Sequence, residues 1–158
     1  MSTRSWRIPL AAAGVAAVTA AALLANAPAA SAATYNQEGW STQSGGTSGG
    51  STSTTVTVTS LSALTSAAGS STSQTVKVSG NFTCSADVTV ASNKTILGVG
   101  SSSGLTGCGL KIKGINNVIV RNLKIAKVLA GNGNGDAIHV EKATHIWIDH
   151  NEIGRAYV

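Results

Sequence analysis

The chain has 158 residues, with 11 Lys and Arg, six Asp and Glu, and a formal net charge of +5. The basic residues are scattered and aromatic residues make up only 4% of the chain, so nothing here favours nucleic-acid binding. A mild positive balance would suit an anionic polymer without identifying one.

Residues 1–32 have the layout of a secretory signal peptide. Arg4 and Arg7 form a charged start, an Ala-rich apolar run follows, and NAPAASAA offers cleavage positions near Ala32 or Ala33. A transmembrane anchor is the alternative, but the run is only marginally long enough to span a bilayer. We therefore expect a secreted, extracellular protein with no membrane contact after cleavage. The mature part then carries nine basic and six acidic residues, a net charge of +3.

A segment rich in Gly, Ser and Thr follows at residues 33–54. The stretch STQSGGTSGGSTSTT, residues 41–55, has so few apolar residues that composition alone predicts a flexible linker. From residue 55 onwards the pattern changes to one typical of folded structure. We therefore expect residues 55–158 to form the folded region.

The folded region is expected to begin with a strand and a short helix. VTVTS alternates between apolar and polar residues as a strand does. SLSALTSAAG then places Leu61, Leu64 and Ala68 on one helical face. Ser60 is the expected N-cap of this helix and Gly69 its expected end.

Beyond residue 82 the sequence indicates short strands separated by Gly and Asn turns. The expected strands are DVTV, KTILGVG, GLKIKG, NNVIVRNLKI, DAIHV and HIWIDHNEI, and TVKVSG precedes them. Apolar triplets recur at residues 95–97, 118–120 and 146–148, in steps of 23 and 28 residues. Such spacing favours the coils of a β-solenoid, with Asn122 and His150 at equivalent corners. An antiparallel β-sandwich is the alternative.

Both cysteines, Cys84 and Cys108, lie in the mature part of the chain. Export permits a disulfide, and two cysteines allow a single intramolecular pairing. Two separate buried thiols are the alternative. We expect a structural disulfide that has no catalytic role.

Several blocks in a fixed order resemble the secreted pectate lyase and pectin lyase family. They are GGT followed by VTVTSLSAL, then SNKTILGVG, NNVIVRNLKI and GDAIHVEKATHIWIDHNEI. The resemblance covers residues 39–153, and IWIDH soon after GDAI is its most specific part. It implies an all-β fold, a right-handed parallel β-helix whose N-terminal end is capped by the early helix. Residues 55–158 would be the first coils of an incomplete pectate lyase domain, and the Gly/Ser-rich segment would belong to the fold.

The resemblance implies a monomeric enzyme that cleaves de-esterified pectin, polygalacturonate, by β-elimination with calcium as cofactor. Calcium takes oxygen ligands and can act as a Lewis acid on the sugar carboxylate. Asp136 matches the family's calcium-ligand aspartate in GDAI, and Asn134 stands where many members have a second aspartate. Taken alone, Asp136 could instead cap the turn before AIHV. The arginine base and other ligands are expected beyond Val158, so we assign no catalytic residue and expect this chain to be inactive.

Asp149 beside His150 suggests acid–base chemistry, but adjacent residues of one strand point to opposite faces. We therefore interpret both residues, with Trp147, as a structural signature. Arg121 is also interpreted as structural. His139 stands alone in the sequence, and no spacing of His, Cys and Asp indicates a zinc site.

Two other functions fit the same residues. A pectin lyase would act on methyl-esterified pectin without calcium, and Asn134 leans slightly that way. A non-catalytic β-helix module would bind or support cell-wall polysaccharide, because a fold does not establish a function. In each case a stack of coils that ends in an open apolar face is expected to be poorly soluble.

Overall fold

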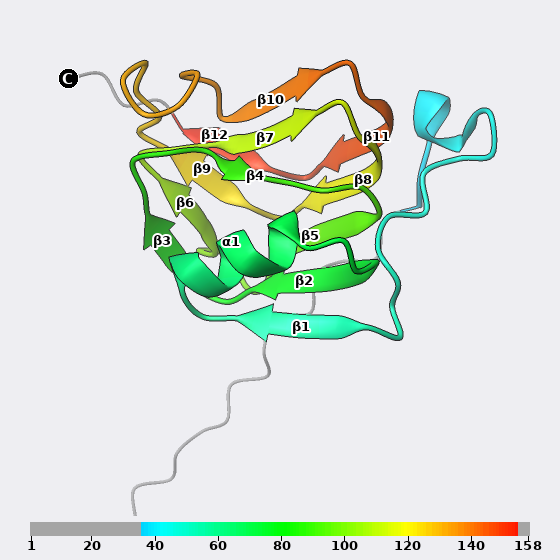
Figure 1. Cartoon of the computed structure of the whole chain (residues 1–158), viewed down its shortest axis with the longest axis horizontal. Helices are drawn as coiled ribbons and strands as arrows, with labels where there is room; N and C mark the ends of the chain where they lie inside the picture. Colours follow the sequence, from blue (N-terminus) through cyan, green and yellow to red (C-terminus); the bar gives the residue numbers. More distant parts are fainter. Residues whose placement is uncertain (1–35, 155–158) are drawn as a thin grey trace, which may run out of the picture.

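The computed structural model describes residues 36–154, which form a stack of coils built from parallel strands (Figure 1). The expected signal peptide lies outside the described residues. The five-stranded sheet contains, in spatial order, β1 (Thr55–Val58), β2 (Gln74–Val78), β5 (Lys94–Gly98), β8 (Asn116–Arg121) and β11 (Thr144–Asp149). The three-stranded sheet contains β4 (Val88–Thr89), β7 (Leu110–Lys113) and β10 (Ile138–Glu141). The four-stranded sheet contains β3 (Asn81–Thr83), β6 (Gly104–Thr106), β9 (Lys124–Ala126) and β12 (Glu152–Gly154).

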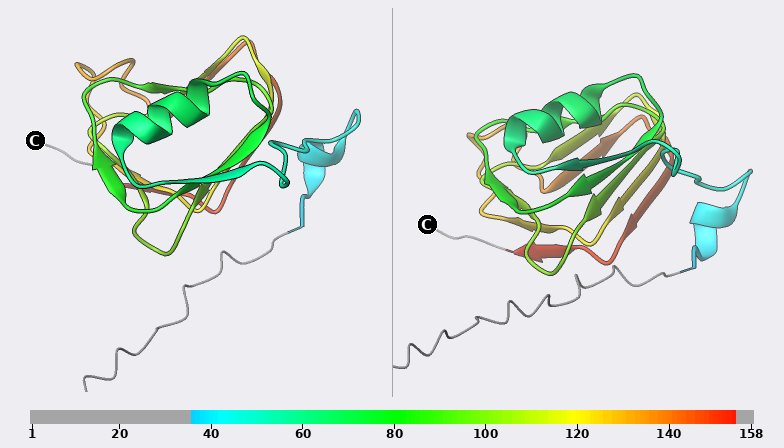
Figure 2. Two further views of the ribbon diagram at one scale, coloured as in Figure 1. Left: turned by 60° about the horizontal axis from the view of Figure 1, so that its bottom comes forward. Right: turned by 90° about the horizontal axis from the view of Figure 1, so that it is seen from below.

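Every strand pair among these residues is parallel, and the chain visits the three sheets in turn. This arrangement is a parallel β-helix, as predicted, and it excludes the antiparallel sandwich. Figure 2 shows the coils from two further sides, with their apolar residues enclosed between the sheets. Strands β3 and β6 were not predicted, because three residues are too few to show a pattern.

The predicted helix is α1 (Leu61–Gly69), and it lies beside β4 at the β1 end of the stack (Figure 2). Ser60 caps it as predicted, since its Oγ accepts the backbone N–H of Ala63 at 3.3 Å. Leu64 and Ala68 are buried against the first coil. No helix in the described part of the chain is long and apolar enough to cross a membrane.

Register between coils differs from the prediction at one step. Ile96 of β5 pairs with Val120 of β8, a step of 24 residues, whereas the aligned triplets predicted 23. The predicted alignment would have matched Ile96, which faces inward, with Ile119, which faces outward. The next step is 28 residues, as predicted, because Val118 pairs with Ile146.

A buried lysine closes the end of the stack that carries α1. Lys94 is fully buried, and its Nζ donates to the carbonyl oxygens of Ser70, Thr72 and Ser92 at 2.8, 2.7 and 3.2 Å. Ser70 follows α1 directly, so the ammonium binds the end of the helix to the first coils. Burial lowers the pKa of Lys94.

The disulfide predicted between Cys84 and Cys108 is confirmed, with a Cα–Cα distance of 5.4 Å. Cys84 follows β3 and Cys108 precedes β7, so the bond joins successive coils at one corner of the stack. Both cysteines belong to the buried core.

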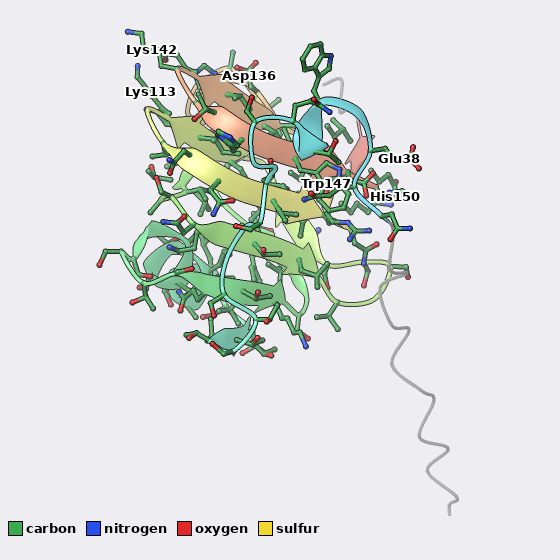
Figure 3. The ribbon with its side chains drawn as sticks, turned by 90° about the vertical axis from the view of Figure 1, so that its right-hand side faces the viewer. Glu38, Lys113, Asp136, Lys142, Trp147 and His150 are labelled. Atoms are coloured by element: carbon green, nitrogen blue, oxygen red, sulfur yellow. A yellow bond between two sulfur atoms is a disulfide. The ribbon has the colours of Figure 1, made fainter. Side chains whose placement is uncertain are left out.

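The Gly/Ser-rich segment is part of the fold, so the linker interpretation is wrong for residues 44–50. This strap follows η1, a 3-10 helix (Gly39–Thr42), and crosses the outer side of the five-stranded sheet (Figure 3). Asn117 Oδ1 accepts the backbone N–H of Gly49 at 2.7 Å. Thr95 Oγ1 accepts that of Gly50 at 3.0 Å. The sheet therefore holds the strap through backbone groups that composition does not reveal.

We predict that Gly50→Ala lowers the free energy of unfolding by about 2 kcal/mol or more, because the strap would have to move. An added Cβ would lie 1.8 Å from the carbonyl oxygen of Gln74. Gly131→Ala is the matched control, since no atom lies within 4 Å of its added Cβ. Urea unfolding of both variants measures the difference, and equal midpoints would contradict the prediction.

We also predict that the 158-residue chain self-associates through the edge formed by β10, β11 and β12. Val140, Ile148 and Ile153 are 44%, 42% and 59% exposed there, beside unpaired strand edges. Ile153→Lys should shift the chain towards monomer in size-exclusion chromatography. A wild-type chain that runs as a monomer at high concentration would refute this.

Candidate functional site

The loop of residues 127–137 joins β9 to β10 and carries both expected metal ligands. Asn132 Nδ2 donates to the carbonyl oxygen of Gly107 at 2.9 Å. The backbone N–H of Asn134 donates to Asp87 Oδ2 at 3.1 Å. Because these partners belong to two earlier coils, the loop is held against the start of the three-stranded sheet.

Asn134 and Asp136 have different roles in this loop. Asn134 Oδ1 accepts the backbone N–H of Asp136 at 3.1 Å, so the turn-capping role considered for Asp136 belongs to Asn134. The Asp136 side chain is 56% exposed, and its Oδ2 lies 2.8 Å from His139 Nδ1. Of the two residues, Asp136 is therefore the more available oxygen ligand.

His139 links two carboxylates on the outer side of β10. Besides its contact with Asp136, its Nε2 lies 3.4 Å from Glu141 Oε2. The hydrogen bonds with Asp136 and then Glu141 raise the pKa of His139. Lys113 Nζ lies 2.7 Å from Glu141 Oε2, and this contact, followed by the one with His139, lowers the pKa of Glu141. The sequence analysis missed this group, although the spacing of 139 and 141 on one strand could have revealed it.

These side chains share one outer surface, which we name the β7–β10 face. Its members are Lys111, Lys113, Asp136, His139 and Glu141. Leu110 and Ile112 are fully buried, so the two lysines that alternate with them on β7 point outward. The register places each of these lysines opposite an outward residue of β10. The face therefore combines an exposed carboxylate with several cationic groups.

The WIDH block lies on a different sheet. Asp149 Oδ1 is 2.7 Å from His150 Nδ1, and Asp149 Oδ2 is 3.1 Å from Arg121 Nε. The Arg121 guanidinium also lies over the ring of Trp147, 4.6 Å from its centroid. Figure 3 shows Trp147 and His150 well apart from Lys113. These contacts join β8 to β11 and support the structural interpretation.

One step of the argument for that interpretation was wrong. Asp149 and His150 do not point to opposite faces, because their side chains contact each other. Strand β11 ends at Asp149, and His150 adopts a positive φ of 49°, outside the alternation of the strand. Asn122 has a similar φ of 54° at the equivalent corner of the preceding coil.

The described residues do not complete a calcium site by themselves. Calcium takes roughly six to eight oxygen ligands. Within residues 36–154, no three His, Cys, Asp or Glu side chains gather so that they could hold a metal ion. Asp136 supplies one carboxylate, and the side-chain oxygen of Asn134 already accepts a hydrogen bond. A calcium ion here would need oxygen ligands from a substrate and from residues beyond those described.

Comparisons with known proteins agree with the fold and the motifs. A family model described as pectate lyase matches residues 11–157. The chain is 51% identical over 96 residues to a probable pectate lyase B of Aspergillus flavus. It is 50% identical over 96 residues to pectate lyase plyB of Emericella nidulans. Each match covers 61% of this chain and 28% of the relative, so the chain corresponds to about a quarter of these curated relatives.

Two solved structures have the same architecture. The pectate lyase Bsp165PelA from Bacillus sp. N165, in complex with trigalacturonate, aligns with a TM-score of 0.66 at 26% identity. The match covers 76% of this chain and 43% of that one. The thermostable pectate lyase PL 47 aligns with a TM-score of 0.64 at 22% identity, over 73% of this chain and 47% of that one.

We predict that His139 titrates above its ordinary pKa of 6.5, and that Asp136→Asn moves its pKa down towards that value. Because the folded-state pKa is raised, the stability that His139 contributes is fully present below pH 6.5. It is lost as the pH rises through the folded-state pKa. NMR titration of the histidine ring measures this. Glu38→Gln, which changes a distant carboxylate, is the control, and an unchanged His139 titration in Asp136→Asn would contradict the assignment.

Proposed function

Since the chain belongs to the pectate lyase family, we propose that it forms the first coils of a secreted enzyme that cleaves polygalacturonate by calcium-assisted β-elimination. The observation that carries this proposal is the β7–β10 face. There the exposed Asp136 carboxylate lies on the same surface as Lys111, Lys113 and His139. An anionic sugar polymer and a divalent cation are partners that suit such a mixture of charges.

Polygalacturonate presents a carboxylate next to the C5 proton that elimination removes. A bound calcium ion would supply positive charge to stabilise the anion that forms there. Asp136 is the residue of this chain that we propose as a ligand, with a minor contribution from Asn134. Lys111 and Lys113 add positive charge on the same surface, which favours an anionic substrate.

The family resemblance implies an arginine base, and the described residues offer none beside Asp136. Arg121 is the one arginine in residues 36–154, and it contacts Asp149 and Trp147 on the five-stranded sheet. It is therefore interpreted as structural. We accordingly propose that the 158-residue chain binds substrate without cleaving it.

Export is also part of the proposal. The arrangement of residues 1–32 indicates a signal peptide, and the Cys84–Cys108 disulfide is of a kind that persists outside the cytosol. An extracellular location is where a protein would meet pectin.

A second candidate is a non-catalytic module that binds cell-wall polysaccharide. The absence of an arginine from the β7–β10 face, among the described residues, is the observation that favours it. Binding without product formation would be its full function, rather than one step of catalysis.

The test uses a chimera in which residues 1–153 are followed by the remaining coils of the Aspergillus flavus relative. We expect it to release unsaturated products from polygalacturonate, measured by ultraviolet absorbance, only when calcium is present. The isolated 158-residue chain should release none. Asp136→Asn should lower the chimera's rate by at least about tenfold, through loss of a metal ligand.

Glu38→Gln, which removes an exposed carboxylate far from the β7–β10 face, should leave the rate unchanged. A folded chimera that cleaves only methyl-esterified pectin would replace the proposal with a pectin lyase. A folded chimera that binds polygalacturonate without cleaving it would favour the module. Product release by the isolated chain would overturn the proposal that it is inactive.

A further inference from the structure

Lys111 occupies the middle of an outward ladder that crosses three successive strands. Its register partners are Thr89 of β4 on one side and His139 of β10 on the other. Neighbouring strands lie about 4.8 Å apart, so the three side chains form a row along the axis of the stack. A polymer that lies along this row would meet one coil after another.

The cations of the β7–β10 face are not equally available. Lys113 is 2.7 Å from Glu141, and His139 lies between that glutamate and Asp136. Lys111, by contrast, forms no ion pair or hydrogen bond through its side chain with any residue in the described part. Its side chain is half-buried, so its stem is restrained along the sheet while the ammonium stays available for a ligand.

The ligand class follows from this geometry. A lone ammonium on a restrained stem favours a carboxylate, with which it forms a charge-assisted hydrogen bond. A methyl ester carries no charge and offers a weaker partner. The exposed hydroxyl of Thr89 lies next in the row and suits the hydroxyl groups of a sugar.

We propose that Lys111 binds a uronate carboxylate of the polymer and forms a subsite that distinguishes de-esterified from methyl-esterified pectin. This inference rests on the proposed function, because it takes polygalacturonate as the ligand. It adds a residue that no assignment of the metal or the base requires. The carboxylate that Lys111 binds belongs to a sugar other than the one at Asp136.

The test is affinity electrophoresis of the 158-residue chain in native gels that contain polygalacturonate or highly methyl-esterified pectin. A chelator is present, so that calcium does not contribute. We expect Lys111→Met to raise the dissociation constant for polygalacturonate about fivefold, in keeping with a partly exposed ion pair. Lys111→Arg should keep most of the affinity. None of the variants should change the weak binding to methyl-esterified pectin.

Lys77→Met is the matched control, because it removes an exposed lysine from β2 on a different sheet. Equal affinity of wild type and Lys111→Met for polygalacturonate would overturn the inference alone. An equal loss in Lys77→Met would do the same, because it would show a general effect of net charge. A wild-type chain that does not bind polygalacturonate at all would overturn both the inference and the substrate proposed for the family site. A chimera without lyase activity, together with a Lys111-dependent affinity, would remove the enzyme proposal and leave the inference standing.

Discussion

Register between successive coils is the constraint on which this structure depends. In a stack of parallel strands, a slip of one residue turns every inward side chain outward. Backbone conformation fixes the register at two corners of each coil. Asn93, Asn117 and His145 have positive φ angles at one corner, and Asn122 and His150 at the other. The row of outward groups on the β7–β10 face exists because these corners repeat.

Features that depend on local pattern could be predicted from the sequence. The capped helix, the longer strands and the single disulfide pairing each follow from a few neighbouring residues or from a count. The step between β5 and β8 could not be read from triplets, because Thr95 and Ile119 both face outward and look like members of either row. The strap escaped prediction for a different reason. Its partners, Asn117 and Thr95, lie far along the chain and accept backbone N–H groups, which every residue possesses.

The candidate site shows the same division. Asp136 was found through a motif, and its surroundings were not. His139 looks isolated in the sequence, yet strand alternation brings it between Asp136 and Glu141. Lys111 drew no attention either, since its position depends on the register of three strands. The chemistry of a β-helix therefore has to be read across coils, because residues that act together are about one coil apart in the chain.

Lys94 has a consequence for how this fold relates to ions in its surroundings. Its ammonium fills a cage of three carbonyl oxygens, the kind of site that other proteins give to a potassium or calcium ion. Here the cation is covalently tethered, so it cannot be diluted, exchanged or chelated. The first coils therefore stay closed whatever the ionic composition outside. The protein keeps its architecture independent of free metal, and only the surface around Asp136 is left to respond to it.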